Sequence, residues 1–194
     1  AVLNDVDVQG YADIREHLGQ NSSGLDVLSG NRSSDQRRPL VPAMFAGVLA
    51  RLRRTHTVIL VDVSDDLEHP VTEAVLASCD TIVFVSGLTA DTSLPVTRAI
   101  DLLRAMGHHE LVSRSMVILN DIRSHQDKEA VGYLTEKFSR SGAAVEYLPY
   151  DAYLAKGGII DIENELNKNT RLRLFEITAV LADKYVPEAD RPRG

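Results

Sequence analysis

Three short runs of this sequence are apolar at nearly every position and rich in β-branched residues: Thr57–Asp62, Thr81–Ser86 and Ser115–Asn120. A strand with one face in water alternates apolar and polar residues, whereas a run that is apolar on both faces is typical of a strand covered by helices on both sides. A fourth strand is predicted at Ala144–Leu148. The chain must therefore bury a sheet between two layers.

Segments with helical periodicity separate these runs. They are Pro42–Arg54, Pro70–Ser78, Thr92–Met106, Lys128–Ser139 and Arg171–Tyr185, and the short apolar run Leu25–Leu28 is a candidate further strand. Strands that alternate with helices indicate βαβ units. We expect an α/β fold with a mostly parallel sheet and helices on both faces. It forms one domain over residues 1–186, with a disordered polar tail at 187–194.

Composition excludes several classes of protein. The longest apolar runs fall far short of the ~20 residues that span a bilayer, so no direct membrane insertion is expected. A single cysteine, Cys79, cannot form an internal disulfide, which favours a reducing, cytoplasmic compartment. The formal net charge of −7 argues against nucleic-acid binding. Because the sequence opens at Ala1 without a methionine, we interpret it as a fragment.

Polar residues follow the predicted strands, at the edge of a parallel sheet where ligands bind. Asp62 ends one strand in the manner of a Walker B aspartate, which holds Mg²⁺ through water; the alternative is a cap for the next helix. The amide of Asn120 can pair with a nucleobase edge or form an Asx-turn. Pro149 and Asp151 can flank a base or simply make a turn.

A phosphate-binding loop of the pattern Gly-x4-Gly-Lys-Ser/Thr is absent from the chain. Its backbone N–H groups and lysine surround the phosphates, and none of the five lysines here follows a glycine. Lys156-Gly157-Gly158 resembles the start of such a loop but does not follow a buried strand, so we reject it.

The order of these segments resembles the MinD/ParA family of deviant-Walker P-loop ATPases. Within that family the sequence is most similar to the EspI-like branch associated with type VII (ESX) secretion. The segments that carry the resemblance to the family are Leu25–Ser29, Val58–Asp62, Ala77–Val85, Val117–Asn120 and Leu148–Asp151. The segments typical of the branch are Tyr11–Leu18 and Ser113–Asn120.

This resemblance implies a nucleotide-binding domain that forms a homodimer around Mg-ATP. Asp62 matches the Walker B aspartate, a catalytic and metal-binding residue; Asn120 matches the asparagine that contacts adenine; Pro149 and Asp151 match the turn beside the base. The phosphate loop and the first two strands would precede Ala1. The intact protein would be an ATPase with secretion-system partners, and this chain alone would bind no cofactor. The alternative is a non-catalytic scaffold built on a degenerate nucleotide-binding fold.

Without those first strands, Thr57–Asp62 lacks hydrogen-bonding neighbours although its sequence demands burial. Each orphaned buried backbone group costs ~1–3 kcal/mol, so several would exceed a typical domain stability of ~5–15 kcal/mol. We therefore expect this run to pair with another strand, with a second copy or with a separate N-terminal piece.

Overall fold

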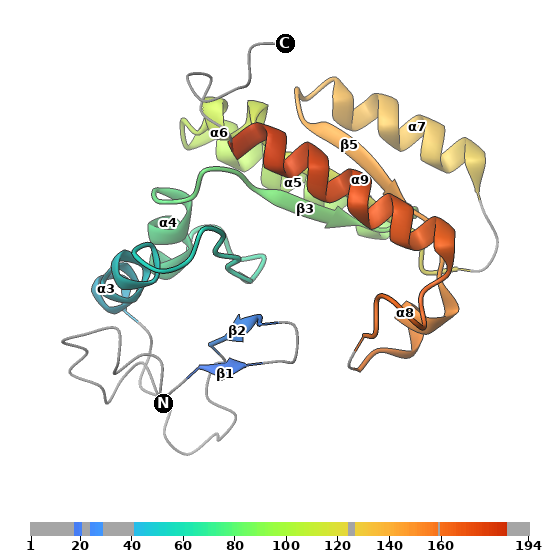
Figure 1. Ribbon diagram of the computed structural model, residues 1–194. Helices are drawn as coiled ribbons and strands as arrows, with labels where there is room; N and C mark the ends of the chain where they lie inside the picture. The colour runs from blue at the N-terminus through green and yellow to red at the C-terminus, as the bar shows by residue number, and fades with distance from the viewer. Residues whose placement is uncertain (1–17, 21–23, 29–40, 124–126, 159, 186–194) are drawn as a thin grey trace, which may run out of the picture. The chain divides into compact units, whose positions relative to one another are not determined.

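The computed structural model describes residues 18–20, 24–28, 41–123, 127–158 and 160–185 (Figure 1). Within these residues, seven helices and a three-stranded parallel sheet form a mixed α/β structure. The chain divides into two compact units, Ala1–Cys79 and Asp80–Gly194. The predicted polar tail at 187–194 lies outside the described residues.

The first unit contains a short antiparallel hairpin and two helices. The hairpin pairs β1 (Gly19–Gln20) with β2 (Asp26–Val27). Helices α3 (Pro42–Leu52) and α4 (Pro70–Leu76) each begin with proline, whose fixed φ suits the first helical position. The two helices pack together, and the buried apolar side chains among the described residues of this unit are Val48, Leu49, Leu67, Val75 and Leu76.

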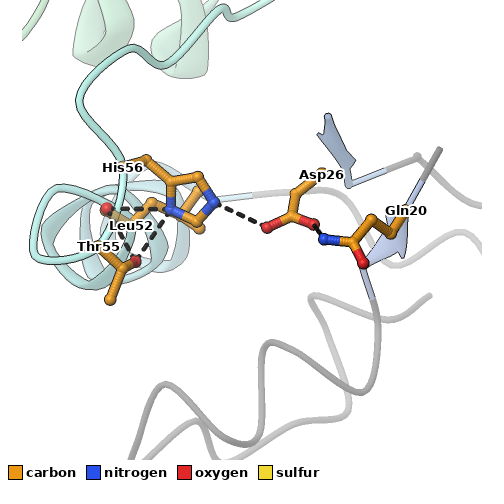
Figure 2. Close-up of polar contacts among 5 residues, drawn as sticks. All are labelled: Gln20, Asp26, Leu52, Thr55 and His56. Atoms are coloured by element: carbon orange, nitrogen blue, oxygen red, sulfur yellow. Dashed lines mark hydrogen bonds and ion pairs between the residues drawn. The ribbon is translucent and has the colours of Figure 1, made fainter. Parts of the chain in front are cut away.

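A histidine just after α3 links this helix to the hairpin (Figure 2). The Nε2 atom of His56 lies 3.0 Å from Asp26 Oδ2, and Gln20 Nε2 donates to Asp26 Oδ1 at 3.1 Å. On its other side, His56 Nδ1 lies 2.9 Å from Thr55 Oγ1. Two-residue strands are marginal by themselves, so this polar contact helps to hold the hairpin against the end of α3.

The segment Thr57–Asp62 is not a strand, and the prediction of a doubly buried strand there is wrong. Its backbone is irregular, and the apolar side chains Val58 and Leu60 are 65% and 83% exposed. A strand needs a neighbour to accept and donate its backbone hydrogen bonds, and none of the described residues supplies one. The expectation that the run pairs again within this chain therefore also fails.

The second unit contains the parallel sheet. Its strands are β3 (Val83–Ser86), β4 (Met116–Asn120) and β5 (Ala144–Leu148), in the order β3-β4-β5. The three corresponding runs were predicted as strands. Helices α5 (Ala90–Ala105) and α7 (Lys128–Ser139) connect them, as the sequence predicted for both.

Three further helices complete the second unit. The short helices α6 (His109–Ser113) and α8 (Ala152–Lys156) follow α5 and β5, respectively, and neither was predicted. The long helix α9 (Lys168–Tyr185), which was predicted, packs on β5 and lies in front of the sheet in Figure 1.

The two faces of the sheet differ in how completely they are covered. The Ser86 hydroxyl donates to the Thr92 carbonyl of α5 at 3.4 Å, so α5 covers the face that carries Ser86. Successive residues of a strand point to opposite faces, so Val83 and Val85 lie on the other face. There they are 37% and 61% exposed. The predicted burial of this strand on both sides is therefore wrong for the second face.

The core of the second unit lies around the central strand. Met116, Val117 and Leu119 of β4 are completely buried. The helices add the buried side chains Val96, Ile100, Leu103, Leu111, Val112, Leu134, Phe138 and Ile177. None of the helices in the described ranges is long and apolar enough to cross a bilayer.

Candidate functional site

The candidate site lies at the carboxyl ends of the parallel strands β3, β4 and β5. These strands end at Ser86, Asn120 and Leu148, respectively. Asn120 is opposite Leu148 in the register, and the Asp121 N–H donates to the Leu148 carbonyl at 2.9 Å. The turn Pro149–Asp151 therefore begins next to Asn120, and the structure brings these predicted site residues to one edge of the sheet.

Asn120 has a side chain that is available to a ligand. It is the last residue of β4 and is partly exposed. Within the described part of the chain, its side-chain amide makes no hydrogen bond. An Asx-turn at this position, the alternative to base recognition, would need that amide oxygen to accept a nearby backbone N–H.

Asp121, which was not predicted as a site residue, has such a structural role instead. The residue is 5% exposed, and its Oδ1 accepts from the Arg123 N–H at 3.0 Å. The Tyr147 hydroxyl donates to Oδ2 at 3.0 Å. These two bonds fix the turn after β4 against β5 and leave the neighbouring Asn120 amide uninvolved. In the sequence, only the acidic residue type directly after Asn120 could have indicated that position 121 accepts these hydrogen bonds.

Asp151 is buried and fully engaged with protein donors. Its side chain is the N-cap of α8, where Oδ1 accepts from the Tyr153 N–H at 2.8 Å. Oδ2 accepts from both the backbone N–H of Asn167 at 3.1 Å and its side-chain amide at 2.7 Å. The Asn167 side chain in turn caps α9 by accepting from the Thr170 N–H at 2.9 Å. Asp151 thus connects the starts of α8 and α9.

The loop between β3 and α5 borders the same edge of the sheet. Thr89 and Thr92 form a reciprocal capping box at the start of α5. The Thr89 hydroxyl and the backbone N–H of Asp91 lower the pKa of the Asp91 carboxyl, and the Arg123 charge contributes to the same shift. The shift thus comes chiefly from donors at the start of α5 itself.

Asp62, the predicted Walker B residue, belongs to the first unit. It is exposed and lies in an irregular segment. In the described residues its carboxylate neither caps a helix nor makes a hydrogen bond; the side chain that caps α4 is that of His69. Nor do the described residues contain a cluster of three or more His, Cys, Asp or Glu side chains arranged to hold a metal ion.

The comparisons with known proteins give one kind of relative. The chain is 27% identical over 186 residues to the ESX-1 secretion-associated protein EspI of Mycobacterium tuberculosis, in both strain CDC 1551 / Oshkosh and strain ATCC 25618 / H37Rv. The alignment covers 95% of this chain but only 28% of each relative. No family model matches the sequence.

Proposed function

We propose that this chain is the C-terminal part of a MinD/ParA-like nucleotide-binding domain that acts in type VII secretion. In the intact, cytoplasmic protein, binding of Mg-ATP would switch dimerisation or the binding of secretion partners. The observation that carries the secretion role is the similarity to EspI, which extends over 95% of the chain.

The residues at the sheet edge fit the base of a nucleotide better than its phosphates. The Asn120 amide offers one donor and one acceptor, as the edge of adenine requires, and Pro149 lies beside it. The sequence has no glycine-lysine loop for the triphosphate, so this chain fits only part of the ligand. Mg-ATP supplies a phosphoanhydride bond whose hydrolysis can drive a change between two states. Asp62, which belongs to the first unit, is the residue that the resemblance assigns to Mg²⁺.

Asp151 contributes to this site by positioning the turn. Its two carboxylate oxygens already accept three N–H groups, from Tyr153 and Asn167. A carboxylate engaged in this way holds the backbone of Pro149–Asp151 in place, while Asn120 makes the direct contact with the base.

Calorimetric titration with Mg-ATP tests the nucleotide part of this proposal. We expect no tight binding to this chain, because it lacks the phosphate loop, and tight binding to the intact protein. Asn120→Ala in the intact protein should weaken binding about tenfold, as expected for the loss of ~1.4 kcal/mol of hydrogen bonding. Asn164→Ala is the matched control, since among the described residues the Asn164 side-chain amide bonds only the exposed Asp161 carboxylate. Tight binding to the short chain, or equal affinities for the Asn120 variant and wild type, would contradict the proposal.

A non-catalytic scaffold is the second candidate, because the similarity to a secretion-associated protein supports a role in secretion without requiring nucleotide binding. Complementation separates the two functions. In cells deleted for the gene, the export of type VII substrates should be restored by the wild-type gene and not by Asn120→Ala if nucleotide binding is required. A scaffold would support export equally well with either gene.

A further inference from the structure

Helix α9 is apolar on two opposite sides. Its inner side packs into the second unit, where Thr170 and Ile177 are buried and Leu174 is half-buried. Its outer side carries Leu172 and Phe175, which are 56% and 79% exposed. A helix that only covers a sheet needs one apolar stripe and a polar outer face.

The outer apolar residues follow a regular spacing. Leu172, Phe175, Ala179 and Ala182 are all exposed, at intervals of three, four and three residues. This is the spacing of the a and d positions through which two helices pair side by side. The first two residues supply apolar area, and the two alanines leave room for a partner helix to approach closely. We call these four residues the outer stripe of α9.

Other surface helices of the same unit show that the outer stripe is unusual. The exposed face of α7 has one large apolar residue, Tyr133, among charged and small residues. The exposed face of α5 likewise has one, Leu94. Single exposed apolar residues are normal on protein surfaces, whereas Leu172 and Phe175 are two large exposed apolar residues one helical turn apart on the same side of α9.

Charged residues beside the outer stripe indicate what covers it. Arg171 precedes Leu172, and Glu176 follows Phe175. In a parallel helix pair, the residue before an a position faces the residue five positions later on the partner helix. Arg171 of one copy would then face Glu176 of a second copy.

We propose that α9 binds α9 of a second copy of this chain, in parallel, through the outer stripe. Arg171 already donates to the Glu163 carbonyl at 2.6 Å, but its guanidinium has five N–H groups and keeps donors for a partner. Glu176 accepts from Arg173 at 2.6 Å through Oε2, which leaves Oε1. This contact needs no nucleotide and goes beyond the proposed function.

The length and composition of the stripe determine the strength expected of this dimer. Ten residues of helix span ~15 Å, which is short for a stable interface. Half of the stripe is alanine, so Leu172 and Phe175 contribute most of the apolar area that the dimer buries. The dimer should therefore be reversible and depend on protein concentration.

Sedimentation velocity of this chain without nucleotide, over a range of concentrations, tests the proposal. Leu172→Ser and Phe175→Ser should each weaken the dimer by about tenfold or more while leaving the melting temperature almost unchanged, because both side chains point away from the core. Tyr133→Ser is the matched control and should leave dimerisation unchanged. The proposal would be overturned if the chain were monomeric at every concentration. It would also be overturned if Tyr133→Ser weakened the dimer as much as Leu172→Ser and Phe175→Ser.

A substitution at the alanine end tests whether the helices approach closely. Ala179→Gln keeps a good helix former but adds a long side chain between the two helices. It should weaken the dimer, again with little change in melting temperature, because Ala179 is exposed in the single chain. Unchanged dimerisation of this variant would overturn the pairing of α9 along the whole stripe.

Charge exchange tests the parallel orientation. Arg171→Glu and Glu176→Arg should each weaken the dimer by placing like charges opposite each other, and the double variant should restore it. Single variants that dimerise like wild type would overturn the parallel arrangement. So would a monomer that binds phosphatidylglycerol vesicles through Phe175, because the outer stripe would then serve a lipid surface.

Discussion

The central strand β4 and the segment Thr57–Asp62 have nearly the same kind of sequence, but the first is a buried strand and the second is exposed and irregular. In β4, which has a strand on each side, Met116, Val117 and Leu119 are completely buried. In Thr57–Asp62, which has no neighbouring strand among the described residues, Leu60 is 83% exposed. Strand β3 has one neighbouring strand, and its burial is intermediate between that of β4 and that of Thr57–Asp62. An apolar β-branched run thus specifies the capacity to form a strand, and its neighbours decide whether the strand forms.

Hydrogen exchange should show the largest difference between these two regions. The amides of Val117–Leu119 open only with the second unit as a whole, so they should exchange at least about a thousandfold more slowly than those of Val58–Leu60. Exchange measured by NMR or mass spectrometry checks this expectation. Equal protection would mean that Thr57–Asp62 finds a strand partner in solution.

Truncation of one leucine in each region compares their packing. Leu119→Ala should lower the free energy of unfolding by ~2–5 kcal/mol, because it leaves a cavity beside completely buried neighbours. Leu60→Ala should change it by no more than ~0.5 kcal/mol, because the side chain is mostly in water. Urea denaturation measures both, and a large effect at Leu60 would show that this side chain is buried in solution.

Removal of an aspartate should likewise destabilise the second unit more than the first. Asp151→Ala removes the acceptor of three N–H groups and should lower the free energy of unfolding by ~2 kcal/mol. Asp62→Ala should change stability by less than ~0.5 kcal/mol, since Asp62 is exposed and irregular. Thermal melts of the two variants make the comparison, which fails if Asp62 proves as important for stability as Asp151.

The smallest effect concerns pH. The pKa of Asp91 is lowered from 3.8, chiefly by the Thr89 hydroxyl. A lowered pKa means that the ionised form stabilises the fold above pH 3.8, and that this contribution is lost as the pH falls through the lower value. Thr89→Val should return the pKa toward 3.8 in an NMR titration, and Thr97→Val, further along α5, should not. Because Asp91 is fully exposed, the change in stability should be slight.

Much of the second unit could be predicted from sequence because its signals are local. Ala144–Leu148 and Lys128–Ser139 have the bounds predicted for them, since β-branched alternation and helical spacing each extend over a whole element. Helices α6 and α8, with five residues each, are too short to show a period. The prediction of a doubly buried strand at Thr57–Asp62 was wrong, because burial on both sides depends on neighbouring strands that the sequence of this segment cannot supply.

The candidate site was predictable to a similar degree. The gathering of Asn120, Pro149 and Asp151 at one edge follows from parallel strand topology, which alternating strands and helices predict. The partner of Asp151 could not be predicted, because Asn167 is sixteen residues further along the chain. The same holds for Asp121 and Tyr147, which are twenty-six residues apart.

The bond between Asp151 and Asn167 also bears on how this molecule tolerates change. One carboxylate anchors both ends of the stretch between them, so that stretch can lengthen without releasing α9. The free-energy cost of closing a loop grows only with the logarithm of the loop's length, by ~0.6 kcal/mol for each doubling. Natural insertions, or engineered tags and reporter domains, should therefore be accommodated after α8 more readily than elsewhere around the sheet.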